Sequence, residues 1–169
     1  MAVRSAPKGY HSLTLALAVR DVAAAIDFYK QAFGAVEYLR LALPDGSIMH
    51  AELGIGDSKL MLGEESDEEG GPRCPRTLGG VTRAVYLYVA DVDAGFKQAV
   101  KAGAKVQMPV ADMFWGDRYG QVVDPSGHLW EIATPKRVSG RAADGAQRRK
   151  RPRVRTAARR SGARPKAGR

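Results

Sequence analysis

Cysteine and long apolar runs are scarce in this 169-residue chain, and each scarcity excludes a class of protein. The single cysteine, Cys74, excludes an intrachain disulfide, so we expect a reducing compartment and place the chain in the cytoplasm. The apolar stretch from Leu13 to Val19 covers only seven residues, whereas a membrane-spanning helix needs about 20. We therefore expect no membrane partner.

Acidic residues are scarce at the C-terminal end, where positive charge accumulates. Residues 1–135 hold 13 Lys and Arg and 17 Asp and Glu, whereas residues 136–169 hold 14 Lys and Arg and one acidic residue, Asp144. Large aliphatic side chains are also nearly missing from 136–169, so this segment cannot bury enough apolar surface to offset its conformational entropy. We predict that it is a disordered basic tail.

The basic tail has one especially dense run of positive charge. It comprises Arg148, Arg149, Lys150, Arg151 and Arg153. Such a run predicts non-specific nucleic-acid binding, because lysine and arginine release counterions from the phosphates. Two alternatives stay open: the tail folds back on the acidic segment 64–69, or it has no function of its own.

One sequence pattern occurs twice, 70 residues apart. The run LALAVRDVAA at 15–24 returns as VYLYVADVDA at 85–94, and in each copy an apolar strand-like run ends at an Asp that opens a helix-like pattern. Both helical patterns end at Gly-Ala, at 34–35 and 103–104. Such a repeat indicates a duplicated supersecondary unit. It also pairs every position with a counterpart in the other copy.

Each copy predicts one helix and four strands. Asp21 and Asp91 are expected N-caps, because a side-chain oxygen there accepts from free backbone N–H groups. The expected strands are 12–19, 37–43, 47–55 and 59–62 in the first copy, and 83–89, 105–109, 119–123 and 128–133 in the second. We predict an α+β fold of two tandem βαβββ units. Its parts are a leader (1–10), unit one (11–62), an acidic linker (63–80), unit two (81–135) and the tail (136–169).

Four motifs in order connect the chain to a known family. They are AIDFY with FGA (25–35), MHAE (49–52), FWGDRYG (114–120) and DPSGH (124–128). Together they resemble the vicinal oxygen chelate superfamily of glyoxalase I, bleomycin-resistance proteins and extradiol dioxygenases, and within it the PhnB-like branch. The resemblance covers 11–135. It implies that the two units form a curved mixed sheet around a small-molecule cavity, and that the protein is a homodimer.

The resemblance also implies four positions for metal ligands, on the first and last strand of each unit. In this sequence they hold Thr14, Met61, Ala84 and Glu131. One hard donor does not make a divalent site, since Zn²⁺ or Fe²⁺ takes three or more N, O or S ligands. His11 lies three residues off this register, so its side chain is expected on the opposite face. We therefore predict no metal and no other cofactor.

His50 and Glu52 are the first candidate catalytic residues. They lie two apart on an expected strand, so both side chains leave the same face. A carboxylate beside an imidazole can fix its tautomer and raise its basicity for acid–base work, and the pair could also hold a relocated metal. The alternative is a surface pair. Glu131 is the third candidate, with a structural hydrogen-bonding role as its alternative.

The candidate ligand-binding residues are mostly aromatic. Trp115, Arg118 and Tyr119 belong to a glycine-bounded loop that can stack on a ring and pair with an anion. Alternatively, Trp115 plugs one end of the barrel while Asp117 and Arg118 form a structural ion pair. Tyr88 and Thr14 complete the set, with core packing as the alternative for Tyr88. His128 is expected to face solvent, and Cys74 to be an incidental thiol.

Two classes of function follow for a chain of this kind. In the first, the protein binds or sequesters a small organic ligand without a metal, as drug-resistance members of the superfamily do. In the second, it is an enzyme of the lyase, isomerase or dioxygenase type that uses His50, Glu52 and Glu131, with the tail tethering it to nucleic acid. The positions without hard donors favour the first.

Overall fold

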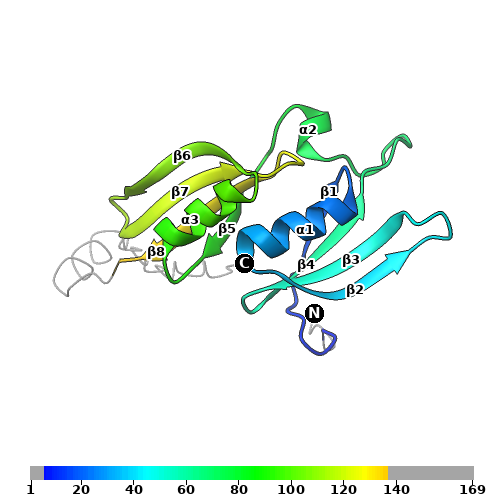
Figure 1. Ribbon diagram of the computed structural model, residues 1–169, viewed down its shortest axis with the longest axis horizontal. Helices are drawn as coiled ribbons and strands as arrows, with labels where there is room; N and C mark the ends of the chain where they lie inside the picture. The colour runs from blue at the N-terminus through cyan, green and yellow to red at the C-terminus, as the bar shows by residue number, and fades with distance from the viewer. Residues whose placement is uncertain (1–5, 137–169) are drawn as a thin grey trace, which may run out of the picture. The chain divides into compact units, whose positions relative to one another are not determined.

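The computed structural model describes residues 6–136, which belong to a compact unit ending at Lys136 (Figure 1). Its first half contains β1 (Leu15–Val19), α1 (Val22–Phe33), β2 (Val36–Ala42), β3 (Ile48–Ile55) and β4 (Ser58–Glu64). Its second half contains β5 (Val85–Tyr88), α3 (Val92–Lys101), β6 (Lys105–Asp112), β7 (Asp117–Val123) and β8 (Leu129–Pro135). A short helix, α2 (Pro75–Leu78), lies between them. The predicted nucleic-acid-binding run in the tail lies outside the described residues.

Aspartate caps begin both long helices, as the sequence predicts. The Asp21 side chain accepts a 2.9 Å hydrogen bond from the backbone N–H of Ala24, and Asp91 accepts one of 3.1 Å from Ala94. Helix α1 ends at Gly34, whose φ of 65° lies in the left-handed region that a residue with a Cβ avoids. The helix boundaries therefore follow from a few local residues.

The eight strands form two separate four-stranded sheets. Their orders are β1-β4-β3-β2 and β5-β8-β7-β6, and the first pair in each is parallel while the others are antiparallel. The repeat is kept in the register: Ala16 pairs with Met61 in the first sheet, and Tyr86 pairs with Glu131 in the second. The predicted tandem βαβββ units are confirmed, and β1 and β5 are edge strands of their sheets.

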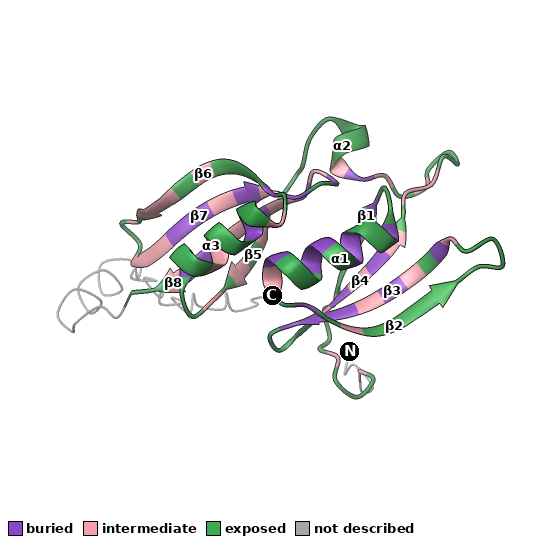
Figure 2. Cartoon of the chain, viewed as in Figure 1, coloured by how far each residue is buried: buried purple, intermediate pink, exposed green. Residues whose placement is uncertain are grey.

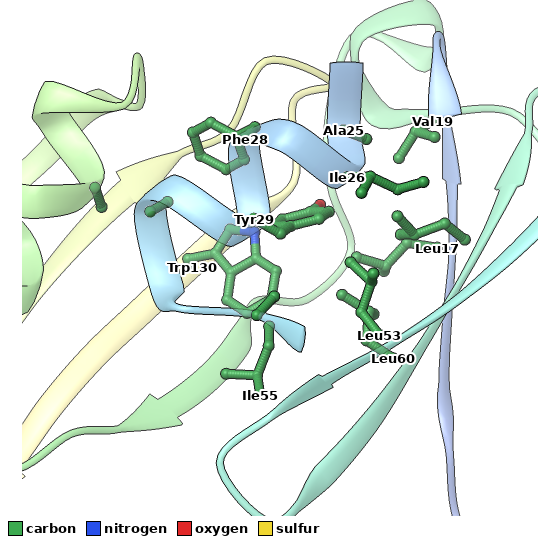
Figure 3. Close-up of a cluster of buried hydrophobic side chains, with 14 of the residues drawn as sticks. Leu17, Val19, Ala25, Ile26, Phe28, Tyr29, Leu53, Ile55, Leu60 and Trp130 are labelled. Carbon is green, nitrogen blue, oxygen red and sulfur yellow. The ribbon is translucent and has the colours of Figure 1, made fainter. Parts of the chain in front are cut away.

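Helices and aromatic side chains join the two units. Gln98 on α3 donates a 2.8 Å hydrogen bond to the Gln31 carbonyl of α1. The ring of Trp130 on β8 lies 5.4 Å from that of Tyr29 and 4.5 Å from that of Phe33, both from the first unit, as the close-up of the core shows for Tyr29 (Figure 3). Trp130 is buried, so the core of the second unit continues into the first.

Each sheet has one side that faces its helix and one that does not. On β3, half-buried His50 and Glu52 alternate with fully buried Ala51 and Leu53, and Figure 2 shows buried and intermediate stretches along this strand. On β7, a Cβ added at Gly120 would lie 2.9 Å from the Phe96 ring of α3, so Gly120 faces the helix. We call the opposite side of each sheet its open face.

The expectation that His128 faces solvent is wrong. His128 is buried, and its Nε2 lies 2.8 Å from the Ala18 carbonyl oxygen of the first unit. Cys74, the expected incidental thiol, is fully buried beside α2, and its backbone N–H donates to Glu65 Oε2 at 3.1 Å. Both burials depend on segments distant in sequence.

Helix lengths bear on the expected absence of a membrane partner. Among residues 6–136, no helix is both long and apolar enough to span a bilayer.

Candidate functional site

The open face of the second sheet gathers four aromatic rings, which we call the aromatic patch: Tyr86, Tyr88, Trp115 and Tyr119. The Tyr86 ring lies 5.0 Å from the Tyr88 ring and 5.9 Å from the Tyr119 ring, and the Trp115 ring stands edge-on to Tyr119 at 5.5 Å. Tyr86, Tyr88 and Trp115 are 40%, 61% and 50% exposed, while Tyr119 beneath them is 5% exposed. The aromatic patch therefore consists of one buried ring beneath three rings that are open to solvent.

Two carboxylates lie within the aromatic patch. Asp117 Oδ2 accepts hydrogen bonds from the Tyr86 hydroxyl at 2.9 Å and from Trp115 Nε1 at 3.2 Å. Glu131 Oε1 accepts one of 3.1 Å from Gln121 Nε2, which also donates to the Tyr119 hydroxyl at 2.7 Å. Every one of these donors is a neutral group, so the two negative charges are solvated but not neutralised by them.

Two tyrosines of the patch, Tyr86 and Tyr119, keep their protons to high pH. Burial, followed by hydrogen bonding to Glu131, raises the pKa of Tyr119 to about 12. Burial and the Asp117 carboxylate likewise raise the pKa of Tyr86. Both phenols are therefore neutral near pH 7, available as hydrogen-bond donors and as electron-rich rings.

Arg118 lies away from the patch, although the sequence grouped it with Trp115 and Tyr119. Its guanidinium donates hydrogen bonds of 2.5 and 2.7 Å to the carboxylate of Asp93 on α3, and a third of 3.0 Å to that of Asp112 on β6. It alternates with Asp117 and Tyr119 along β7, so it points to the helix side of the sheet. The partners of Arg118 are therefore Asp93 and Asp112, and not Asp117 or an anionic ligand over the patch.

The open face of the first sheet holds the predicted acid–base pair. His50 Nε2 lies 3.6 Å from Glu52 Oε1, and the Tyr10 hydroxyl donates to Glu52 Oε2. This hydrogen bond raises the pKa of Tyr10. Glu131, the third predicted catalytic residue, lies on the other sheet and shares no hydrogen bond or ion pair with the other two among residues 6–136. One chain therefore brings His50 and Glu52 together with Tyr10, but not with Glu131.

A lysine lies among tyrosine rings on the same open face. Lys59 Nζ lies 3.0 Å from the centroid of the Tyr38 ring and 5.5 Å from that of the Tyr10 ring. The Tyr38 ring crosses Gly54 so closely that a Cβ there would lie 2.5 Å from Tyr38 Cε2. Sequence reasoning missed Tyr10, Tyr38 and Lys59. The signal available in the sequence was Gly54 on β3, a glycine that the aromatic ring of Tyr38 on β2 crosses.

A cavity of about 780 Å³ separates the edge strands β1 and β5. Phe33 and Trp130 line it, as do Thr14 and Tyr88, two of the predicted ligand-binding residues. His11 also lines it. The predicted ligand-binding residues other than Arg118 thus divide between this cavity and the aromatic patch, with Tyr88 common to both.

The positions that the resemblance assigns to metal ligands do not fit a divalent cation. Met61 pairs in register with Ala16, and Glu131 pairs with Tyr86, so the sheets place one carboxylate among groups that are poor ligands for a hard cation. Within residues 6–136, no group of three or more His, Cys, Asp and Glu side chains is arranged to hold a metal ion. We therefore assign no chemical step to a metal ion at these four positions.

Known proteins share both the sequence and the fold. An uncharacterized protein of Mycobacterium tuberculosis is 46% identical over 123 residues, which are 72% of this chain and 72% of that protein. The crystal structure of TioX from Micromonospora sp. ML1 matches with a TM-score of 0.58 and 31% identity, over 74% of this chain and 98% of TioX. The PhnB protein from Bacillus cereus matches in fold, with a TM-score of 0.57 at 15% identity over 73% of this chain and 99% of that one.

A family model accounts for the described domain as a whole. Residues 11–132 match the model of the Glyoxalase/Bleomycin resistance protein/Dioxygenase superfamily. This range spans both βαβββ units and both sheets with their open faces. The chain belongs to this superfamily, which is the vicinal oxygen chelate family that the four motifs resemble.

Proposed function

We propose that this protein binds and sequesters a small organic ligand over the open face of its second sheet. The observation that carries the proposal is the aromatic patch, where three solvent-exposed rings stand over a buried fourth. Exposed aromatic groups of this kind are rare on a protein surface unless something binds them. Sequestration needs only shape and contact, which the patch supplies without a reacting group.

Binding without a metal is part of the proposal. Glu131 is the single hard donor among the four positions considered, and its Oε1 already accepts from Gln121. We expect purified protein to contain far less than one divalent metal per chain by elemental analysis. A stoichiometric metal that survives dialysis would contradict this part.

A ligand screen tests the proposal directly. Planar aromatic compounds would be screened by thermal shift against the wild type and Tyr88→Ala, which removes the most exposed ring of the patch. The matched control is Tyr38→Ala, which removes a tyrosine of similar exposure (60%) from the other sheet. We expect some compounds to raise the melting temperature of the wild type and the control but not of Tyr88→Ala. The proposal fails if no compound separates these variants.

We also propose a homodimer assembled through the edge strands. β1 and β5 end their sheets with backbone groups free to pair, and apolar side chains accompany them: Leu13 is 92% exposed and Leu15 is 38% exposed. Pairing β1 of one copy with β5 of another would join the first sheet of one chain to the second sheet of its partner. Light scattering coupled to gel filtration should give twice the chain mass, and Leu13→Lys with Leu15→Lys should give a monomer. A wild type of single-chain mass contradicts the proposal.

We also propose a cytoplasmic location, which is the location expected from the single cysteine.

The contact of His50, Glu52 and Tyr10 favours one alternative, an enzyme with acid–base chemistry. Glu52 is placed to take a proton while Tyr10 donates one, since both lie on the same open face. Compounds found in the screen separate the two candidates. An enzyme would convert them and would lose turnover in Glu52→Gln with binding retained, whereas a sequestering protein returns them unchanged.

A further inference from the structure

The charge on the aromatic patch points to the class of ligand. Asp117 and Glu131 both lie among the rings, and neither takes part in any ion pair within residues 6–136. The nearest basic residue along β7, Arg118, is bonded on the helix side. The patch therefore combines electron-rich ring faces with two carboxylates whose hydrogen-bond donors are neutral.

The first sheet shows what such a face does with a cation. There the Lys59 ammonium lies 3.0 Å from the centroid of the Tyr38 ring and 5.5 Å from that of the Tyr10 ring, and the Tyr10 hydroxyl donates to Glu52. The chain thus supplies its own cation to a tyrosine and carboxylate surface. Attraction of this kind comes from the ring quadrupole and strengthens when the cation loses water.

The second sheet lacks the corresponding lysine. The repeat of 70 residues places Leu129 where the first unit has Lys59, and the pairing of Trp130 and Glu131 with β5 keeps that register. The aromatic patch, like the first open face, combines tyrosine rings with carboxylates, although at other positions of the sheet, and it has no lysine over its rings among the described residues. An external cation would complete it.

We infer that the ligand of the aromatic patch is an organic cation with a planar aromatic body. The rings of Tyr86, Tyr88 and Trp115 would stack on the body and face the positive charge, while Asp117 and Glu131 would neutralise it. An anion is repelled by both carboxylates. The inference rests on the proposed function, because it names the chemistry of the ligand bound at that same site.

Three probes of similar size and different charge test the inference. They are N-methylquinolinium, a permanent cation; quinoline, which is neutral at neutral pH; and naphthalene-2-sulfonate, an anion. Isothermal titration calorimetry on the full chain should show the cation binding about tenfold more tightly than quinoline, and the anion most weakly.

Single substitutions test whether Asp117 and Glu131 cause the preference for the cationic probe. Glu131→Gln and Asp117→Asn should each lower the affinity for N-methylquinolinium several-fold and leave that for quinoline unchanged. Glu68→Gln, an exposed acid whose side chain forms no hydrogen bond or ion pair with residues 6–136, is the matched control and should change neither. Trp115→Ala, in an exposed loop, should weaken both probes and guards against a variant that fails to fold.

The outcomes separate the inference from the proposed function. Equal affinity for the cation and quinoline, both lost in Trp115→Ala, overturns the inference while the binding function stands. Tightest binding of the sulfonate overturns it as well. Binding of none of the three, with no hit in the screen, removes the binding function together with the inference.

Discussion

The hydroxyl of Tyr29 on α1 donates a 2.6 Å hydrogen bond to Oδ2 of Asp124, 95 residues later in the chain. Asp124 is buried and accepts three more hydrogen bonds, from Trp130 Nε1 and from the backbone N–H groups of Ser126 and His128. One carboxylate therefore ties the turn of the second unit to the helix of the first.

Loss of the Tyr29 hydroxyl should weaken this tie. We expect Tyr29→Phe to lower the free energy of unfolding by about 1–2 kcal/mol, since a buried hydrogen bond to a charged group is lost. Urea unfolding followed by circular dichroism measures it. Tyr38→Phe, which changes an exposed hydroxyl, is the control and should be neutral within error. Equal stability of all three proteins would show that the bond contributes nothing.

Alkaline pH should destabilise the fold through Tyr119. A tyrosine in the unfolded chain loses its proton near pH 10, whereas Tyr119 in the folded chain holds its proton until about 12. The pKa is raised on folding, so this contribution is complete below pH 10 and is lost as pH rises from 10 to 12. Urea unfolding at stepped pH should show stability falling over that window. Tyr119→Phe should flatten the slope, and an unchanged slope would contradict the assignment.

Gly127 and Gly46 allow backbone strain to be separated from steric clash. Both have positive φ, 93° and 88°, but a Cβ at Gly127 would lie 2.7 Å from the backbone N of Arg76, whereas nothing lies within 4 Å at Gly46. We expect Gly46→Ala to cost about 1–2 kcal/mol for the left-handed backbone alone. Gly127→Ala should cost more, because Arg76 must move and its 3.0 Å hydrogen bond to the Ser126 carbonyl would break. Melting temperatures in the reverse order would contradict the contact.

Removal of residues 137–169 should separate nucleic-acid binding from folding. This segment holds 13 Lys and Arg and one acid, Asp144, so its loss removes the excess positive charge. We expect a chain ending at Lys136 to lose retention on DNA in a low-salt mobility-shift assay and to keep its melting temperature. Retention by the shortened chain would place any nucleic-acid contact in the folded domain instead.

Local chemistry explains which parts of the fold the sequence predicts. The caps at Asp21 and Asp91 and the stop at Gly34 act over a few residues, so the helices can be placed from the printed sequence. Helix α2 escapes prediction because it is a single turn of four residues, begun by Pro75 inside a loop rich in glycine and proline. Propensity carries no periodic signal over so short a stretch.

The candidate site divides in the same way. His50 and Glu52 can be placed on one face from their spacing, and the exposed aromatic residues can be listed. The contact of Tyr10 with Glu52 cannot be predicted, because the two residues lie 42 positions apart and the chain between them must fold first. The side of the sheet on which Arg118 lies cannot be predicted, for a related reason. Its partner Asp93 lies on α3, and no local sequence pattern pairs an acid with a base 25 residues later.

The aromatic joint between the two units has a consequence for how this protein can change. Tyr29, Phe33, Trp130 and Asp124 hold the units together through helices and buried groups, on the side opposite the open faces. Substitutions at Tyr88 and Trp115, the most exposed rings of the proposed ligand site, should therefore change binding there at little expense to stability. Under the proposed function, the ligand could change by surface substitutions during evolution while the buried aromatic joint keeps each intermediate folded.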